Sequence, residues 1–358
     1  MLINYASTRR RALAALLTLP VAALAACGST DTGSGAPAPT GSSAPALDRN
    51  ATLTLYNAQH DTLTKAWVEA FTAKTGIKVE IRQGSDLTMA NQLAAEGSAS
   101  PADVFLTENS PAMSLVENAG LFAQVDAATL AQVPAEYSPS TGKWVGIAAR
   151  STVLAYNPTK ITEAELPKSI MDLQDPKWNG KFGAAPKGAD FQAIVSAMLE
   201  LKGEAATKTW LAALKSGGQA HTGNSAAMKA VNAGTSTTAV IYHYYWYGDQ
   251  AKTKENSNNV KLHFFGGQDP GAFVSVSGGG VLKSSKHPAE AQALLQYITG
   301  KDGQKLLADS TAFEYCVGKD VPSNSALKPL TELGAPKVDP SKLNSKKVVD
   351  LMTTAGLI

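Results

Sequence analysis

The sequence predicts an α/β fold with two domains, in which mostly parallel strands alternate with helices. Three observations support this prediction. Between residues 51 and 120, short strand-like segments alternate with amphipathic helical segments. The apolar run at residues 146–156 is long enough to be a strand that two domains share. The length of 358 residues favours two domains, and 44% hydrophobic residues are sufficient for buried cores.

The first domain begins with two strands separated by a helix. Thr52–Tyr56 and Ile77–Ile81 alternate apolar and polar residues, as half-buried strands do. Between them, Asp61–Thr75 places its apolar side chains on one helical face, and Gly76 follows at the position where helices commonly end. The same order continues with a helix from Leu87 to Glu96, a strand from Ala102 to Leu106 and a helix from Pro111 to Gly120.

The rest of the chain repeats this pattern less regularly. We expect helices at about 191–202 and 204–215 and a helix from Asn224 to Asn232. The strand at Ala272–Val276 is a candidate for a second crossing between the domains. The remaining expected elements are strands at Thr238–Ile241 and Leu262–Phe265 and helices at Pro288–Thr299 and Gly303–Ala308.

The N-terminus has the features of a lipoprotein signal. Arg9–Arg11 precede an apolar run that ends at Cys27, and Leu24–Cys27 resembles a bacterial lipobox. We therefore expect residues 1–26 to be cleaved and Cys27 to carry lipid, although an ordinary signal peptide with an incidental cysteine has the same pattern. Residues 27–50 are rich in Gly, Ser, Thr, Ala and Pro and are expected to form a flexible tether.

Charge and cysteine content exclude several classes of protein. Residues 1–26 carry three arginines and no acidic residue, so cleavage lowers the formal net charge from +2 to −1. A nearly neutral protein offers no electrostatic argument for nucleic-acid binding. With Cys27 acylated, Cys316 stands alone, which excludes an intramolecular disulfide and a cysteine metal cluster.

An aromatic stretch at residues 241–247 is the most unusual feature of the chain. Aromatic residues make up 7% of the sequence, yet five of these seven are aromatic. Tyr244 and Tyr245 can serve one site only where the strand stops, at its end or in the first turn of a helix, because successive strand residues face opposite sides. The alternative is aromatic packing with the hydroxyls at the surface.

Two further polar residues follow predicted strands. His60 follows the first strand and Glu108 the third, so both are expected at the carboxyl edge of a parallel sheet, where ligand crevices lie. Alone, each is more often a solvated residue. With Tyr244 and Tyr245 they offer an imidazole, a carboxylate and two phenols, which suit a hard cation. Two phenolates and one carboxylate balance a trivalent ion such as Fe³⁺.

From about Leu53 to the C-terminus, the chain resembles the periplasmic ferric-ion-binding proteins of bacterial ABC importers, in extracellular solute-binding family 1. The matching stretches are Tyr56–His60, Pro101–Glu108, Tyr244–Tyr247 and Gln268–Ala272. The resemblance implies that His60, Glu108, Tyr244 and Tyr245 bind Fe³⁺, and that a synergistic anion such as phosphate or carbonate completes the coordination.

The resemblance also implies a type 2 periplasmic-binding-protein fold, with two α/β lobes, a ligand cleft between them and two crossing hinge strands. Lobe 1 would comprise residues 51–150 and 275–325, and lobe 2 residues 151–274 and 326–358. Closure of the lobes around the metal would favour the ligand-bound form.

The anion is expected at the helix that starts near residue 189. Lys187, Gly188 and Ala189 precede this helix, and free backbone N–H groups at a helix start bind anions. By resemblance, Asn224 and Arg150 also contact the anion, although Asn224 can equally cap its own helix.

The chain departs from the family pattern at Lys187, where relatives often carry Ser, and at Tyr242 and His243, where they carry Asn before the paired tyrosines. Asp190, at the helix start, would repel an anion and leaves its identity open. Tyr242 shares a strand face with Tyr244 and is a candidate third phenol, either bound to the metal or just behind it.

The function expected from these features is capture of ferric iron for an ABC importer. The partners would be a permease and its ATPase, with no nucleic acid, and the membrane would be met only through the lipid anchor. We expect a monomer in the cell envelope, periplasmic or on the outer face of the cytoplasmic membrane. The alternative is an importer receptor for a phosphonate, a polyamine or a thiamine-like solute. No Gly-x-Ser-x-Gly, His-Glu-x-x-His or Cys–His pattern suggests an enzyme.

Overall fold

The computed structural model describes residues 47–358 of the chain. The predicted signal peptide, the lipidated Cys27 and nearly all of the predicted tether lie outside the described residues. Within residues 47–358, no helix has both the length and the apolar character that crossing a bilayer requires.

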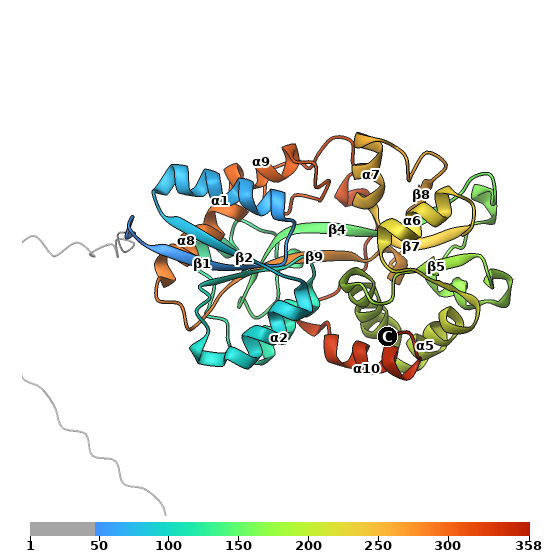
Figure 1. The fold of residues 1–358 in the computed structure, drawn as a ribbon, viewed down its shortest axis with the longest axis horizontal. Helices are drawn as coiled ribbons and strands as arrows, with labels where there is room; N and C mark the ends of the chain where they lie inside the picture. The colour runs from blue at the N-terminus through green and yellow to red at the C-terminus, as the bar shows by residue number, and fades with distance from the viewer. Residues whose placement is uncertain (1–46) are drawn as a thin grey trace, which may run out of the picture. The chain divides into compact units, whose positions relative to one another are not determined.

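The first half of the molecule is a parallel sheet flanked by helices, and it lies on the left in Figure 1. Strand β1 pairs in parallel with β2 on one side and with β3 on the other. Its elements are β1 (Thr52–Asn57), α1 (Asp61–Thr75), β2 (Lys78–Gln83), α2 (Asp86–Glu96), β3 (Val104–Leu106), α3 (Ser110–Asn118), α4 (Ala127–Leu130), α8 (Pro288–Thr299) and α9 (Lys301–Asp309).

The second half is built in the same way, and it lies on the right in Figure 1. Strand β5 pairs in parallel with β6 and β7. Its elements are β5 (Phe182–Ala184), α5 (Ala189–Gly217), β6 (Gln219–Ala220), α6 (Asn224–Asn232), β7 (Thr238–Tyr242), α7 (His243–Lys252), β8 (Lys261–His263) and α10 (Ser345–Thr354).

Two long strands, β4 (Val145–Tyr156) and β9 (Val274–Val281), cross from one half to the other. The strand order is β2-β1-β3-β9-β4-β7-β5-β6, with β8 paired to β4. Every antiparallel pair involves β4 or β9, and every other pair is parallel. The predicted two-lobed α/β fold with crossing strands is therefore confirmed, with the parallel pairing confined to each half.

The hydrophobic cores divide along the same line. Two clusters draw on the first half and two on the second. Leu327 and Leu333 pack in a core of the first half, whereas Leu343 packs in one of the second. The chain therefore passes to the second half after residue 333, later than the predicted boundary at 326, because the apolar side chains at 327 and 333 are buried against the first sheet.

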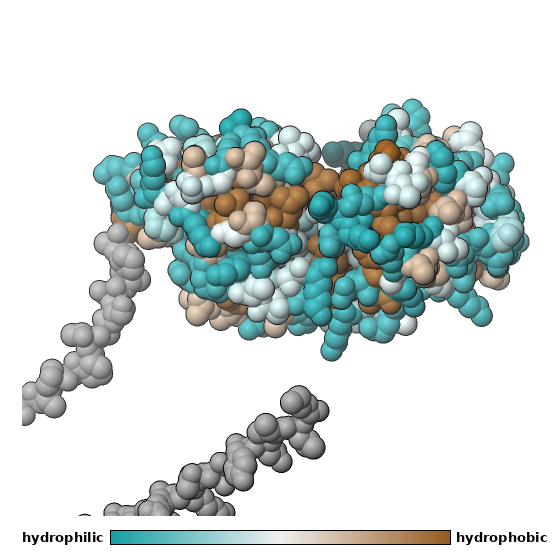
Figure 2. All heavy atoms as spheres, turned by 90° about the horizontal axis from the view of Figure 1, so that it is seen from below, coloured by the Kyte–Doolittle hydropathy of each residue, from teal (hydrophilic) through white to brown (hydrophobic). Residues whose placement is uncertain are grey.

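The surface is largely hydrophilic. In the face shown in Figure 2, apolar residues come to the surface mainly around the middle, and hydrophilic residues cover most of the rest. Leu47 is the only large apolar side chain among residues 47–358 that counts as exposed.

Candidate metal site between the two halves

The four predicted metal ligands come together where the halves meet. His60 directly precedes α1, Glu108 follows β3, and Tyr244 and Tyr245 lie in the first turn of α7. His60 Nδ1 is 3.1 Å from Glu108 Oε1. The ring centroids of His60 and Tyr244 are 5.2 Å apart, and those of Tyr244 and Tyr245 are 4.3 Å apart. Residues separated by almost two hundred positions in the chain thus form one cluster.

Local backbone structure explains how these side chains reach the site. His60 occupies the N-cap position of α1 but makes no side-chain capping bond, so its ring is free to face the site. Strand β7 ends at Tyr242 and α7 begins at His243. The turn from extended to helical backbone places Tyr244 and Tyr245 on one side, which a continuing strand could not do.

Arg150, on the crossing strand β4, is a buried cation at the centre of the cluster. Its Nη1 is 3.1 Å from Glu108 Oε2, and its guanidinium carbon lies 5.3 Å from the centre of the Tyr244 ring. Its Nη2 donates to Glu314, a carboxylate that was not among the predicted site residues. Arg150 was predicted to face an anion, and in the structure it faces protein carboxylates.

Asp190 occupies the place where an external anion was expected. Tyr244 Oη and Tyr245 Oη each donate to its Oδ2 at 3.0 Å, and Asn224 Nδ2 donates to the same oxygen at 2.8 Å. Asn109 Nδ2 donates to its Oδ1 at 2.9 Å. Asp190 is the second residue of α5, at the positive end of the helix dipole. A carboxylate of the protein itself therefore receives the bonds that the tyrosine hydroxyls could offer to an anion.

Of the remaining residues predicted for the anion site, some lie where they were expected and some do not. Gly188 is the N-cap of α5 and Ala189 its first residue, as expected, whereas Lys187 is exposed. The suggested capping role of Asn224 is wrong. Gly223 holds the N-cap position of α6, and the Asn224 side chain bonds to Asp190 instead.

Tyr242 lies behind the paired tyrosines. Its side chain is fully buried, its ring centroid is 6.3 Å from that of Tyr244, and its Oη donates to Asn109 Oδ1 at 3.4 Å. His243 beside it is also buried, stacks on Tyr315 and accepts a hydrogen bond from the Ser151 backbone N–H at 3.1 Å. Burial lowers the pKa of His243 to about 3, so it packs as a neutral ring.

Burial and neighbouring charges determine the ionisation of the site. Burial, reinforced by the charge of Asp190, raises the pKa of Tyr244 and Tyr245, so both phenols are neutral without a cation. Burial also raises the pKa of Glu108. Burial alone would lower the pKa of His60, but the close contact with the Glu314 carboxylate and its charge, with the charge of Glu108, raise it overall.

The donor set suits a cation that binds phenolate. Among residues 47–358, no three or more His, Cys, Asp or Glu side chains are arranged to hold a metal ion by themselves. A metal at this cluster would therefore need the phenol oxygens of Tyr244 and Tyr245 in addition to His60 and Glu108. A trivalent ion within bonding distance would reverse the pKa shift of the phenols, because a nearby positive charge favours the ionised form.

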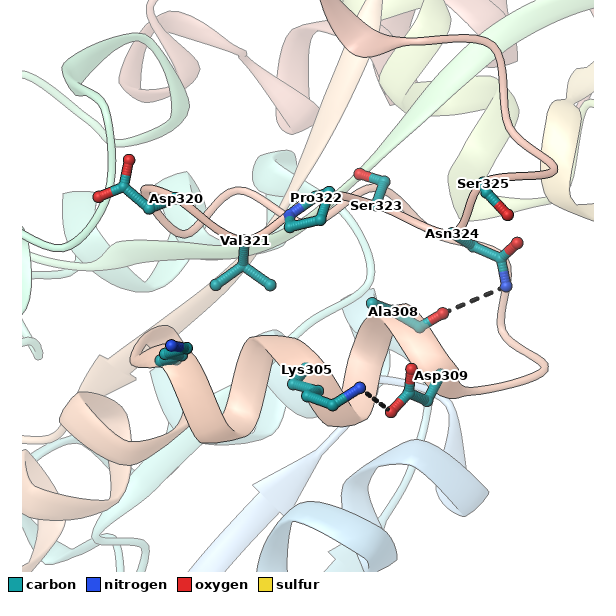
Figure 3. A pocket seen from close by; sticks show the side chains of 10 residues that line it. Lys305, Ala308, Asp309, Asp320, Val321, Pro322, Ser323, Asn324 and Ser325 are labelled. Carbon is teal, nitrogen blue, oxygen red and sulfur yellow. Dashed lines mark hydrogen bonds and ion pairs between the residues drawn. The ribbon is translucent and has the colours of Figure 1, made fainter.

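Two cavities elsewhere lack this chemistry. One, of about 520 Å³, lies between α9 and the segment 320–325 (Figure 3). In it Lys305 is already paired with Asp309 at 2.7 Å, and Asn324 donates to the Ala308 carbonyl. The other, of about 730 Å³, is lined in part by Val274 and Val276 of the crossing strand β9 and by the segment 334–340. Neither contains any of the predicted ligands.

Known proteins are similar to this chain in both sequence and fold. The family model of bacterial extracellular solute-binding proteins matches residues 99–336. The chain belongs to this family. The prediction that it is not an enzyme is confirmed by this membership, because these are transport proteins.

Individual solute-binding proteins give more detail. The chain is 63% identical over 306 residues to the Fe(3+)-binding periplasmic protein of Serratia marcescens, covering 86% of this chain and 90% of that one. It is 36% identical over 310 residues to the major ferric iron-binding protein of Neisseria meningitidis serogroup B, covering 86% and 93%. The crystal structure of iron-bound HitA from Pseudomonas aeruginosa superposes with a TM-score of 0.79 at 46% identity, over 86% of this chain and 100% of that one.

Proposed function

We propose that this solute-binding protein captures Fe³⁺ between its two halves and delivers it to an ABC importer. The observation that carries the proposal is the convergence of His60 and Glu108 from the first half with Tyr244 and Tyr245 from the second. An imidazole, a carboxylate and two phenols form a donor set that a ferric ion prefers. The relatives with ferric iron in their names support the same cargo.

The charge balance supports a trivalent ion. The two phenolates formed on binding and the Glu108 carboxylate together cancel the charge of Fe³⁺. Arg150 and Glu314 form a buried ion pair and so add little net charge to the site. Since only the closed arrangement brings ligands from both halves together, the ion would favour closure, which the permease and its ATPase would detect.

Titration with Fe³⁺ tests this proposal. Phenolate–iron bonds absorb visible light, so the loaded protein should be coloured, and Tyr245→Phe should weaken both the colour and the affinity. Tyr297→Phe removes a hydroxyl distant from the site and should change neither. A protein that stays colourless with Fe³⁺, but gives binding heat with a phosphonate, polyamine or thiamine-like solute, would favour the alternative cargo.

The synergistic anion, phosphate or carbonate, stays a prediction, and the site suggests a competing account. We infer that the Asp190 carboxylate takes the place of the external anion, because it already accepts bonds from Tyr244, Tyr245 and Asn224. Once the phenols ionise and bind the metal, they no longer donate to Asp190. Its carboxylate is then free to turn toward the cation.

Anion dependence separates the two accounts. If Asp190 fills the anion position, the Fe³⁺ affinity of the unaltered protein should not change when phosphate or bicarbonate is added. Asp190→Ala should bind Fe³⁺ more weakly and recover affinity with either anion. A clear gain of affinity by the unaltered protein on adding phosphate would support the external anion and contradict the role of Asp190.

We also propose that Cys27 is lipidated and holds the protein at the cell envelope, as the Leu24–Cys27 motif predicts. Labelling with a radioactive fatty acid tests this. The unaltered protein should take up label and fractionate with membranes, and Cys27→Ala should do neither. Equal labelling of both would contradict lipidation at Cys27.

A further inference from the structure

Glu314 reaches the site from a third chain segment, which pairs with the crossing strand β4. It follows α9, and the adjacent Tyr315 pairs with Ala149 of β4 through two backbone hydrogen bonds, of 2.8 and 3.0 Å. The side chain of Glu314 is fully buried. A buried carboxylate is costly unless its charge and its lone pairs are satisfied, so its partners indicate why it is there.

Both oxygens of Glu314 contact groups at the metal site. Oε1 is 2.8 Å from His60 Nε2 and also accepts from Arg150 Nη2. Oε2 accepts from Gln59 Nε2 at 3.3 Å and from Ser277 Oγ at 3.4 Å. His60 Nε2 is itself buried, and its N–H is not well aligned with the oxygen, so the contact is a close ion pair rather than an ideal hydrogen bond.

We propose that Glu314 is a positioning residue for the metal site and acts through His60 and Arg150; this inference rests on the proposed function. By holding the buried Nε2 side of the ring, Glu314 orients the other nitrogen, Nδ1, toward Glu108, where the cation would bind. Metal-binding histidines generally give their second ring nitrogen to a carboxylate or carbonyl, which fixes the orientation of the ring.

The second effect runs through Arg150. This guanidinium is shared between Glu314 and Glu108, with Nη2 on the former and Nη1 at 3.1 Å from the latter. Without Glu314, the buried positive charge would have Glu108 as its nearest carboxylate partner. Glu108 would then carry the whole charge of Arg150 and be less available to the metal. Glu314 therefore takes up part of the charge of Arg150, which already donates to Glu108 Oε2, and leaves the other oxygen, Oε1, beside His60 for the cation.

Glu314→Gln tests the proposal, because glutamine keeps the shape but not the charge. Loss of such an orienting partner typically lowers metal affinity about 10- to 100-fold, and we expect a loss in this range. Affinity is measured by competition with citrate. The visible phenolate–iron band should remain, because Tyr244 and Tyr245 are unchanged. Glu290→Gln makes the same change at a buried glutamate far from the site, where the side chain accepts from the Asp48 backbone, and should leave affinity unchanged.

A double-mutant cycle separates positioning from general loss of structure. If Glu314 acts largely through His60, Glu314→Gln should weaken binding much less in a His60→Gln background than in the unaltered protein. Equal losses in both backgrounds would overturn the proposed route through His60. An unchanged affinity of the single variant would overturn the whole inference.

A measurement on the unaltered protein covers the case in which Glu314→Gln does not fold. Ga³⁺ is a diamagnetic substitute for Fe³⁺, so imidazole nitrogens can be observed by ¹⁵N NMR in the Ga³⁺-loaded protein. His60 Nε2 should keep its proton and Nδ1 should show the shift caused by a bound metal. A metal shift at Nε2 would overturn the inference. The proposed function fails separately, if the unaltered protein binds neither Fe³⁺ nor Ga³⁺.

Discussion

At the scale of single residues, the site is a set of acids and bases whose charges depend on one another. Glu314 is fully buried, yet Arg150 and His60 outweigh the effect of burial and lower its pKa to about 2. Burial, strengthened by the charge of Glu108, raises the pKa of Asp86 to about 8, although Asp86 accepts bonds from the Glu108 and Asn109 nitrogens. Removing or adding one charge here therefore changes the ionisation of several neighbours.

These shifts predict how Fe³⁺ binding depends on pH. Two neutral phenols must each lose a proton, and His60, whose pKa is raised, must lose one when it is protonated. Where Glu108 is already ionised and His60 is protonated, affinity should rise with pH as the release of about three protons requires, and above the pKa of His60 as for about two. Competition with a chelator of known pH dependence measures the slope.

His60→Gln is the control for this slope. It removes the imidazole proton, so the slope should correspond to about two protons throughout. In the metal-free protein, the raised pKa of His60 has the opposite effect on folding stability, which falls as the pH rises. Its contribution is fully present below the ordinary histidine pKa of 6.5 and is lost as the pH rises through the raised value. A slope that is the same for both proteins would contradict a protonated His60.

At the scale of elements, two helix starts hold the second half of the site. The β7–α7 junction presents Tyr244 and Tyr245, and the start of α5 presents Asp190 to them. Helix α5 is interrupted at Gly203, where φ is 78° and ψ is 171°. The predicted pair of helices at 191–202 and 204–215 is confirmed by this break. Only the N-terminal part of α5 therefore has to be aligned with the site.

The break at Gly203 predicts a stability difference between two glycine substitutions. Backbone at this φ and ψ is open essentially to glycine only, so Gly203→Ala should lower the free energy of unfolding by about 1–3 kcal/mol. Gly248 lies inside α7 with open space where a Cβ would lie, and Gly248→Ala should raise that free energy by about 0.5–1 kcal/mol. Denaturant unfolding measures both. A neutral Gly203→Ala would contradict a conformational requirement for glycine.

At the scale of the whole molecule, Asn109 connects the two halves directly. It follows β3 in the first half, and its amide nitrogen donates both to Asp86 Oδ2 at 3.0 Å and to Asp190 Oδ1 at 2.9 Å. Its oxygen accepts from Ser275 of the crossing strand β9 and from Tyr242 of the second half. These bonds hold the halves in the arrangement that brings the predicted metal ligands together.

Asn109→Ala should therefore favour an open form of the metal-free protein. Buried polar groups left unpaired cost about 1–3 kcal/mol, which corresponds to a fall in Fe³⁺ affinity of about 5- to 150-fold through the smaller closed population. Small-angle scattering should show a larger radius of gyration for the metal-free variant and compaction when Fe³⁺ is added.

Asn232→Ala provides the control for this measurement, because Asn232 makes exposed contacts within the second half only. It should leave both the radius and the affinity unchanged. If the metal-free Asn109→Ala variant has the same radius as the unaltered protein, Asn109 does not hold the halves together.

Much of the fold could be predicted because its signals are local. The alternation in Thr52–Tyr56, the helical face of Asp61–Thr75 and its Gly76 stop are all read within one segment, and Gly76 indeed has a positive φ of 83°. The helices and strands that were not predicted are α4, β5, β6, α7 and α10. Three of them (α4, β5 and β6) are short, α10 lies at the end of the chain, and α7 was considered only as one way in which the strand before Tyr244 could stop.

The candidate site was predictable only in part. His60, Glu108, Tyr244 and Tyr245 each stand where a strand ends, and strand ends share an edge of the sheet. Glu314 has no such signal. Its partner Gln59 is 255 residues away, and the two side chains meet only because the segment after α9 pairs with β4. Asp190 was expected to repel an anion, and only the structure shows that it accepts hydrogen bonds from Tyr244, Tyr245 and Asn224.

By itself, the sequence determined the type and order of most elements, since caps and apolar periodicity act over a few residues. It also determined which side chains had the chemistry for a ferric ion. Only the tertiary structure decided which charges face one another, because the crossing strands and their connecting segments bring together residues that no local pattern relates. Glu314 on His60 and Asp190 on the paired tyrosines are the results of that long-range packing.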